Sequence, residues 1–255
     1  MNHRILILGG TTEARQLTER LASRAELTAT LSLAGRTQHP VAQAVPVRSG
    51  GFGGVEGLAR YLREERIGLL VDATHPYAAR ISTNAAEAVV AAGVTMLALR
   101  RAPWRKVKGD RWTEVQSGDD AVAALGATPR NVFVALGRQE LAPFEAAPQH
   151  SYLVRSVDPV EPPLAVPNAR YLLARGPFRE DGEKALLLEN RIDAIVAKNS
   201  GGRATYGKIA AARALGIDVI LIQRPNLPPV ESVASVDEAV AAIDHWLAGA
   251  KERGV

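Results

Sequence analysis

The sequence predicts an α/β protein with two Rossmann-like domains, each built on a doubly wound parallel sheet, and with a cleft between them. Short apolar runs alternate with helical patterns along all 255 residues, as in successive βαβ units. Several runs, such as residues 5–8 and 219–222, are almost continuously apolar, which is typical of strands buried on both faces of a parallel sheet. A weak internal echo pairs "ILILGGTTEARQL" at the start of the chain with "VFVALGRQELAPF" from Val132.

The first half contains five expected strands and three expected helices. Each strand is a short apolar run that ends near glycine or a polar residue, and each helix repeats apolar residues every three or four positions. The strands are expected at residues 4–8, 27–33, 44–47, 69–73 and 96–99, and the helices at residues 12–23, 55–65 and 80–92. We expect residues 1–115 to form an N-terminal, cofactor-binding domain.

The second half repeats the alternation. Strands are expected at residues 132–136, 152–154, 171–174, 194–197 and 219–222, and helices at residues 119–125, 182–190, 204–215 and 236–247. Four prolines between residues 159 and 167 indicate a long loop inside this half. We expect residues 116–255 to form a C-terminal, substrate-side domain, with the boundary somewhere between residues 100 and 131.

Composition excludes several classes of site. There is no cysteine, so disulfides, thiolate metal sites and cysteine nucleophiles are absent. The five histidines have no ligand spacing, and no metal site is expected. Neither a G-x-S-x-G elbow nor a Tyr-x-x-x-Lys pair occurs. The first apolar run is too short for a signal peptide or a membrane span, which predicts a cytoplasmic protein without membrane contact.

The charge pattern favours an anionic small molecule. The net charge is +4, the aromatic content is only 5%, and no nucleic-acid recognition motif occurs, so a nucleic-acid partner is not expected. Basic residues gather between Arg100 and Arg111, beside Trp104. This run is interpreted either as a solvated loop between domains or as one wall of a cleft, in which Arg101 and Arg105 would contact a polyanion.

A glycine turn follows the first expected strand, where dinucleotide folds bind the pyrophosphate. The turn and the start of the next helix contain Gly9, Gly10, Thr11, Thr12 and Glu13. The full G-x-G-x-x-G fingerprint is absent, and Thr12 as an ordinary helix N-cap is the structural alternative. We expect these five residues to bind a nucleotide cofactor.

The end of the second expected strand indicates which cofactor binds. NAD sites usually carry an acidic residue there, but no acid occurs between Leu31 and Pro46. Arg36 and Thr37 follow the strand instead, and an arginine suits a 2′-phosphate. NADPH is therefore expected rather than NADH, with a surface arginine as the alternative.

Two further loops are expected at the cofactor. Gly51, Gly53 and Gly54 belong to "SGGFGG", in which the backbone either approaches a ligand closely or forms a flexible loop. "DATHPY" follows the fourth strand, in the region that faces the nicotinamide in open α/β sheets. Its expected cofactor-binding residues are Asp72, Thr74 and His75, and Tyr77 lies beside them. Packing at the start of the next helix is the alternative for His75 and Tyr77.

The densest polar cluster follows the late strand at residues 194–197. Its amides, hydroxyls and lysines indicate a carboxylate-binding site, with helix capping as the alternative. The spacing is not that of a Walker A loop. The expected substrate-binding residues are Lys198, Asn199, Ser200, Gly201, Gly202, Thr205 and Lys208, and Tyr206 lies among them.

These segments together resemble the precorrin-6A reductase family over essentially the whole chain. "LLVDATHPYAARISTNA" and "AIVAKNSGGRATYGKIAAARALGIDVILIQRP" are the most specific parts. The resemblance implies NADPH bound in the cleft between two Rossmann-like domains, without metal or flavin. It implies hydride transfer to a ring carbon of precorrin-6A, which gives precorrin-6B in cobalamin biosynthesis. It also implies an anionic tetrapyrrole as the ligand and transient hand-over to other enzymes of the pathway.

The proton that completes such a reduction has several candidate donors. They are His75, Tyr77, Tyr206 and Lys208, with solvent or the acid groups of the substrate as alternatives. Two other functions stay open: an NAD(P)H-dependent reductase of another anionic substrate, including cobalt-precorrin-6A, and a non-catalytic NADP(H) sensor. The oligomeric state is also open.

Overall fold

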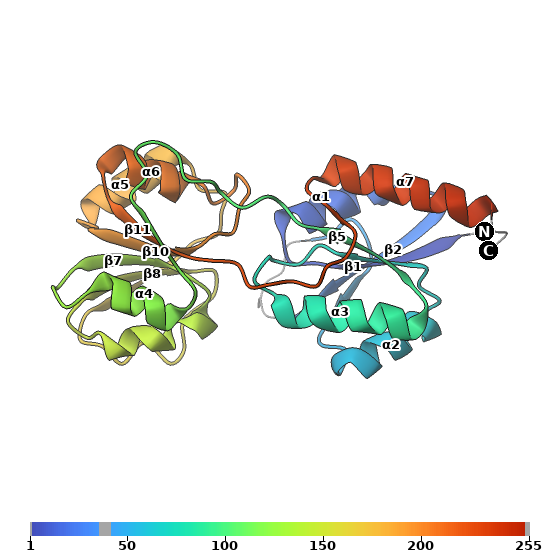
Figure 1. The fold of residues 1–255 in the computed structure, drawn as a ribbon, viewed down its shortest axis with the longest axis horizontal. Helices are drawn as coiled ribbons and strands as arrows, with labels where there is room; N and C mark the ends of the chain where they lie inside the picture. The colour runs from blue at the N-terminus through green and yellow to red at the C-terminus, as the bar shows by residue number, and fades with distance from the viewer. Residues whose placement is uncertain (1, 36–41, 253–255) are drawn as a thin grey trace. The chain divides into compact units, whose positions relative to one another are not determined.

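The chain folds into two compact units, shown in Figure 1 by a computed structural model that describes residues 2–35 and 42–252. Unit 1 comprises Met1–Arg101 and Asn226–Val255, and unit 2 comprises Ala102–Pro225. This division differs from the expected domains, 1–115 and 116–255. The chain enters unit 2 at Ala102, within the expected boundary range of residues 100–131, but it returns to unit 1 at Asn226, because its last helix packs on the first sheet.

Unit 1 is organised around a six-stranded sheet in which every pair of neighbours is parallel. The order is β12-β5-β4-β1-β2-β3. The strands are β1 (His3–Leu8), β2 (Leu27–Leu33), β3 (Val47–Ser49), β4 (Leu69–Asp72), β5 (Thr95–Leu99) and β12 (Ser232–Val233). The chain runs outward from β1 to β3, then crosses to the other side at β4. This is the Rossmann order, whose topological switch point lies between β1 and β4.

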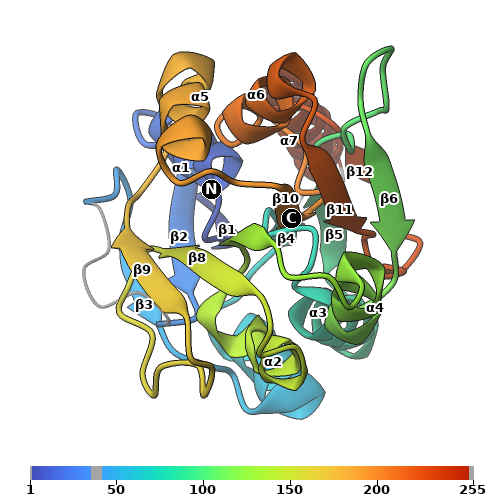
Figure 2. The ribbon, with the colours of Figure 1, turned by 90° about the vertical axis from the view of Figure 1, so that its left-hand side faces the viewer.

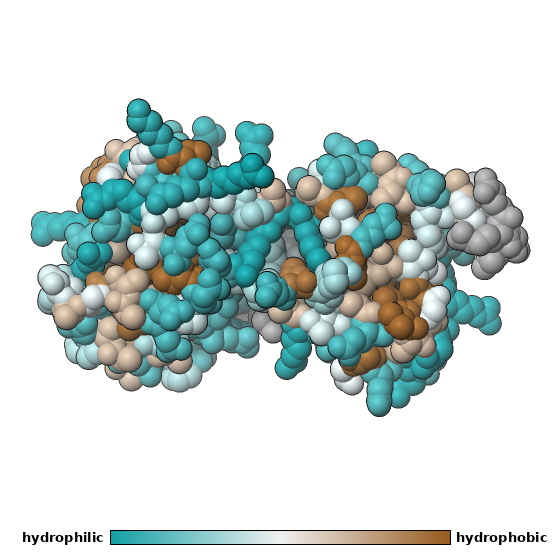
Figure 3. Space-filling view, viewed as in Figure 1, coloured by the Kyte–Doolittle hydropathy of each residue, from teal (hydrophilic) through white to brown (hydrophobic). Residues whose placement is uncertain are grey.

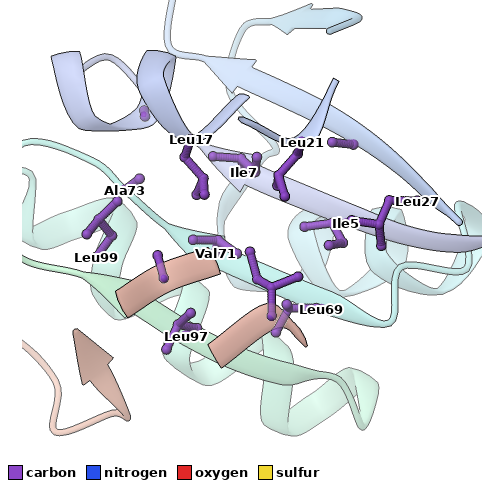
Figure 4. Close-up of a cluster of buried hydrophobic side chains, with 14 of the residues drawn as sticks. Ile5, Ile7, Leu17, Leu21, Leu27, Leu69, Val71, Ala73, Leu97 and Leu99 are labelled. Carbon is purple, nitrogen blue, oxygen red and sulfur yellow. The ribbon is translucent and has the colours of Figure 1, made fainter. Parts of the chain in front are cut away.

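Helices cover both faces of this sheet (Figure 1). α1 (Thr12–Leu21) and α7 (Val236–Glu252) pack on one face, and α2 (Gly54–Glu64) and α3 (Ala79–Ala92) pack on the other. Ile5 and Ile7 point into the first layer, where Leu17 and Leu21 of α1 meet them (Figure 4). Leu6 of β1 is buried in the second layer. Burial on both faces explains why β1 is an unbroken apolar run.

Unit 2 has the same strand order for five of its strands, but its edge strand β6 comes first in the sequence, whereas the edge strand β12 of unit 1 comes last. Its six parallel strands have the order β6-β11-β10-β7-β8-β9 (Figure 2). They are β6 (Trp112–Val115), β7 (Asn131–Ala135), β8 (Ser151–Ser156), β9 (Ala169–Leu173), β10 (Ala194–Lys198) and β11 (Asp218–Ile222). The chain runs outward from β7 to β9 and then crosses to β10, so the switch point of this sheet lies between β7 and β10.

The layers of unit 2 differ from those of unit 1 on one face. α5 (Glu180–Glu189) and α6 (Gly207–Leu215) contribute Leu187 and Ile209 to a core shared with Phe133 of β7. The other face carries α4 (Gly118–Leu125) and two short 3₁₀ segments, η1 (Arg138–Glu140) and η2 (Ala142–Ala146) (Figure 1). The 3₁₀ segments take the place that α1 has after the first central strand.

The structure confirms the predicted doubly wound parallel sheets, and strands or helices occur at all seventeen expected places. The expected strand at residues 44–47 lies later, at Val47–Ser49, and two strands, β6 and β12, were not expected. The face shown in Figure 3 is mainly hydrophilic, with hydrophobic residues in small separate patches. In the described part of the chain, no helix is long and apolar enough to cross a bilayer.

Candidate functional site

The carboxyl ends of the unit 1 strands bring the predicted cofactor residues to one edge of the sheet. β1 and β4 are paired neighbours, with Leu8 beside Asp72. The Thr11 hydroxyl donates to the carbonyl oxygen of Ala73 at 2.8 Å and so joins the glycine turn to the loop after β4. The same hydroxyl accepts the N–H of Ala14 at 3.0 Å. Thr11 is therefore the N-cap of α1, and Thr12, for which a capping role was considered, is the exposed first residue of the helix.

The two glycines of the turn serve different purposes. A Cβ on Gly9 would lie 2.5 Å from Cδ1 of Leu31, so Gly9 permits close packing against β2. Gly10 has a φ of +116°, and no atom lies within 4 Å of a Cβ built on it. The space beside Gly10 is open, next to the first turn of α1, where helices leave backbone N–H groups without intrahelical partners and carry partial positive charge. This arrangement can accept a pyrophosphate.

Glu13 and Arg101, predicted as cofactor and substrate residues respectively, lie together in unit 1. Nη1 of Arg101 is 2.5 Å from Oε2 of Glu13, and the side chains are 16% and 21% exposed. Each charge largely neutralises the other. Arg105 is an exposed residue of unit 2.

The glycine loop after β3 is fixed by a residue that sequence reasoning missed. Arg48 donates to the carbonyl oxygens of Gly50 and Gly51 at 2.6 and 2.7 Å, and its guanidinium lies 3.7 Å from the centre of the Phe52 ring. The Gly50 N–H donates to Leu33 at the end of β2. Gly51, Gly53 and Gly54 are exposed, and the last two have left-handed φ angles of 82° and 84°.

Asp72 organises the loop after β4. It is 3% exposed and accepts hydrogen bonds from the N–H and hydroxyl of Thr74, at 3.1 and 2.6 Å, and from the Ser82 hydroxyl at 2.6 Å. Nδ1 of His75 accepts the N–H of Tyr77 at 3.4 Å, and the two rings are 5.6 Å apart. Asp72 is thus committed to internal contacts, whereas His75 and Tyr77 are half-buried at the edge.

In unit 2, an ion pair joins the loops on either side of the switch point. Lys198 ends β10, and its Nζ contacts Oε1 of Glu140 in η1, after the neighbouring strand β7. Oε2 of Glu140 accepts the N–H of Gly137 at 3.0 Å. The Lys198 side chain is 16% exposed and that of Glu140 is 40% exposed. Glu140 was not among the predicted site residues.

Asn199 and the two glycines Gly201 and Gly202 hold the segment at residues 102–104, which begins the same unit. The Asn199 side chain accepts the N–H of Trp104 at 2.8 Å and donates to its carbonyl oxygen at 3.0 Å. Nε1 of Trp104 donates to the carbonyl oxygen of Gly202 at 2.8 Å. Gly201 has a φ of +69°, and a Cβ there would lie 2.1 Å from the Ala102 oxygen. The Ser200 carbonyl accepts from Arg224 at 2.9 Å.

Lys208 lies inside unit 2, beneath this loop. It is 4% exposed, and its Nζ donates to the Thr205 carbonyl oxygen at 2.8 Å and lies 5.0 Å from the Trp104 ring. Desolvation and, to a smaller extent, the nearby Arg155 charge lower the pKa of Lys208 from 10.5 to about 7, and Glu183 opposes the shift.

The hydroxyl of Tyr206 is also engaged, because it accepts a hydrogen bond from Arg213 at 2.5 Å. Two of the four predicted proton donors, Tyr206 and Lys208, are therefore bound internally. Arg36 and Thr37 lie outside the described residues. Among the residues that are described, no three His, Asp or Glu side chains gather as metal ligands would.

Comparisons with known proteins agree on one family. A family model described as precorrin-6x reductase CbiJ/CobK matches residues 4–244. A precorrin-6A reductase of Sinorhizobium sp is 59% identical over 247 residues, which are 97% of this chain and 95% of that protein. A solved structure of CobK precorrin-6A reductase has a TM-score of 0.91 and 49% identity, and the match covers 97% of this chain and 96% of the other. A cobalt-precorrin-6A reductase of Salmonella typhimurium is 29% identical over 263 residues, covering 97% of this chain and 98% of that protein.

Proposed function

The chain belongs to the precorrin-6x reductase family, and we propose that NADPH, bound by unit 1, is the reductant with which it converts precorrin-6A to precorrin-6B. The reaction reduces one double bond of the macrocycle, and a reductase of this family uses a nicotinamide cofactor. The observation that carries the assignment to unit 1 is the glycine turn at the β1/β4 switch point, where open space beside Gly10 adjoins the start of α1.

The residues of unit 1 fit a dinucleotide. In this proposal the first turn of α1 and the backbone at Gly10 hold the pyrophosphate. The loop fixed by Arg48 lies after β3, beside the end of β2, on the side where Rossmann folds hold the adenosine. His75 and Tyr77, after β4, lie toward the nicotinamide end. The bound cofactor supplies the hydride, and the protein supplies orientation.

The preference for NADPH rests on Arg36. We expect Arg36→Ala to weaken NADPH binding by about 10- to 150-fold, the loss of one charge-assisted phosphate contact, and to leave NADH binding nearly unchanged. Fluorescence titration of both cofactors measures this. Equal losses for NADPH and NADH would contradict the 2′-phosphate assignment.

Unit 2 is proposed to hold the anionic tetrapyrrole through Lys198 and the loop that follows. Asn199, Gly201 and Gly202 shape this loop through Trp104 and Ala102, and Lys208 supports it from inside. Lys198→Met should therefore raise KM for precorrin-6A by about tenfold or more without changing the NADPH Kd. A wild-type KM in this variant would remove Lys198 from the substrate site.

The proton is proposed to come from His75 or Tyr77, with solvent or the substrate as the alternative, because both residues are half-buried in the loop after β4 of the proposed cofactor-binding unit. Loss of kcat at unchanged KM in either His75→Ala or Tyr77→Phe would identify the donor. Wild-type kcat in both variants would assign the proton to solvent or to the substrate.

We further propose that the natural substrate is metal-free and that the reaction takes place in the cytoplasm, with hand-over to neighbouring enzymes of the pathway. The greater identity to the Sinorhizobium protein than to the cobalt-precorrin-6A reductase supports the first point. Parallel assays with precorrin-6A and cobalt-precorrin-6A test it, and a higher kcat/KM for the cobalt form would contradict it.

A further inference from the structure

Glu140 in unit 2 occupies the position that Glu13 has in unit 1. Each is the fifth residue after its central strand, β7 or β1, in the two echoing segments. Each carboxylate forms an ion pair with a cationic side chain at the carboxyl end of another strand. Glu13 pairs with Arg101, after β5, and Glu140 pairs with Lys198, at the end of β10. The two units thus place a carboxylate at the same point of the fold, beside the switch point of the sheet.

Glu140 is more exposed to solvent than Glu13 and lies in a shorter helical segment. Glu13 lies in the first turn of the ten-residue helix α1 and is 21% exposed. Glu140 ends a three-residue 3₁₀ segment and is 40% exposed. Lys198 is the more buried partner, and a mostly buried ammonium group requires a carboxylate or other acceptor beside it. Glu140 is therefore the outer, solvent-facing half of the pair.

The pair also differs from a fully buried one in the same unit. Arg155 and Glu183 are 6% and 4% exposed and share two contacts, whereas Glu140 offers Lys198 one oxygen and uses the other for the Gly137 N–H. Solvent screens a partly exposed pair, whose net contribution is typically about 0–1 kcal/mol. A ligand carboxylate can replace Glu140 on Lys198 at little cost.

From this geometry we propose that Glu140 is a specificity-determining residue, a built-in carboxylate that occupies Lys198 until a carboxylate of the tetrapyrrole replaces it. The inference rests on the proposed function, in which Lys198 binds the substrate. Without substrate, the pair keeps Lys198 compensated and in place. An anion with fewer carboxylates competes less well with Glu140 for Lys198. The Glu140–Lys198 pair therefore favours the binding of a polycarboxylate.

The test compares Glu140→Gln with wild type in steady-state assays of precorrin-6A. The glutamine keeps an amide oxygen for the Gly137 N–H and removes the competing charge. KM for precorrin-6A should fall by about fivefold, the equivalent of the upper value for a partly exposed pair. The NADPH Kd should stay unchanged. The matched control is Glu180→Gln, which neutralises the exposed Glu180–Lys184 pair on α5 and should leave KM unchanged.

The double variant Glu140→Gln/Lys198→Met separates this inference from the proposed function. Its KM should equal that of Lys198→Met alone, because Glu140 acts through Lys198. An unchanged or higher KM in Glu140→Gln, with a raised KM in Lys198→Met, would overturn the role of Glu140 and leave the substrate assignment intact. A wild-type KM in Lys198→Met would instead overturn the substrate assignment.

Discussion

The two units share the order of five strands but differ directly after their central strands. In unit 1, β1 leads through Gly9 and Gly10 into the ten-residue helix α1. In unit 2, β7 leads through Gly137 into 3₁₀ segments, and an ion pair between Glu140 and Lys198 joins the loops at the switch point. In the proposed function, the shared topology provides a ligand-binding edge in each unit, and the residues of the loops determine which ligand binds there.

The cores differ as well. Among the described residues, Arg155, Glu183 and Lys208 are the buried charged residues of unit 2, and the side chain of Asp110 is 1% exposed as well; the buried charged residue of unit 1 is Asp72, which orders a loop. Arg155 and Glu183 pair within the α5 layer, and Arg155 also lies 3.6 Å from the centre of the Phe178 ring. The stability of unit 2 therefore depends on charge compensation more than that of unit 1.

Breaking the buried Arg155–Glu183 pair should have the largest effect on the free energy of unfolding. Glu183→Gln leaves the Arg155 charge uncompensated and should lower the free energy of unfolding by about 3–5 kcal/mol. Glu65→Gln, which breaks the Arg4–Glu65 pair of unit 1 at 41% and 39% exposure, is the matched control and should cost about 0–1 kcal/mol. Urea unfolding measures both. Similar losses in the two variants would contradict the contrast between the cores.

Gly10→Val sharpens the contrast between the central turns. The branched side chain enters the space beside the α1 N-terminus and strains a φ of +116°, so the NADPH Kd should rise about 100-fold or more. Gly137→Ala changes the equivalent residue of unit 2, whose φ of −71° suits any residue, and should leave the NADPH Kd unchanged. Circular dichroism checks that both variants fold. Normal NADPH binding by a folded Gly10→Val protein would make this turn purely structural.

Lys208→Met probes the buried amine of unit 2. The pKa of Lys208 is lowered from 10.5 to about 7 in the folded protein, so between these values the unfolded chain binds more protons. The free energy of unfolding should rise with pH over that range, by up to about 1.4 kcal/mol per pH unit relative to the variant. Urea unfolding of both proteins at several pH values gives the difference. Parallel curves would show that Lys208 keeps an ordinary pKa.

Arg48→Met tests the glycine loop that follows β3 in unit 1. Loss of the two hydrogen bonds to Gly50 and Gly51 frees the loop beside the end of β2, and the NADPH Kd should rise about tenfold. The KM for precorrin-6A should not change. A fall in thermal stability without any change in Kd would show that Arg48 supports the fold but not the cofactor.

Much of the fold could be predicted because the pattern of apolar residues in each strand agrees with the burial of that strand. β1, β4, β10 and β11 are buried on both faces and read as apolar runs. β6 was missed because only Trp112 and Val115 of its four residues are buried. β12 was missed because two residues are too few to show the alternating pattern of a strand. The return of the chain to unit 1 at Asn226 could not be predicted, since a strand–helix alternation does not say to which sheet the last helix belongs.

The site residues could be predicted only where position in the fold determines them. Gly10 follows β1 and Lys198 ends β10, so both lie at the carboxyl end of a strand, as expected. The partners of each side chain depend on residues far away in the sequence: Glu13 pairs with Arg101, Glu140 with Lys198, and Asn199 with Trp104. No local spacing encodes those pairings, so the internal role of Asn199 emerged only from the structure, whereas Asp72 and Lys208 form hydrogen bonds to residues close to them in the sequence.

Hydrogen–deuterium exchange of the whole protein with each ligand is the most direct test of the proposal that unit 1 binds NADPH and unit 2 binds the tetrapyrrole. NADPH should slow exchange in the carboxyl-end loops of unit 1, at residues 9–15, 50–54 and 73–78, and leave residues 137–141 and 198–206 unaffected. Precorrin-6A should protect residues 137–141 and 198–206 of unit 2. Protection of the unit 2 loops by NADPH alone, with no change at residues 9–15, would contradict the account.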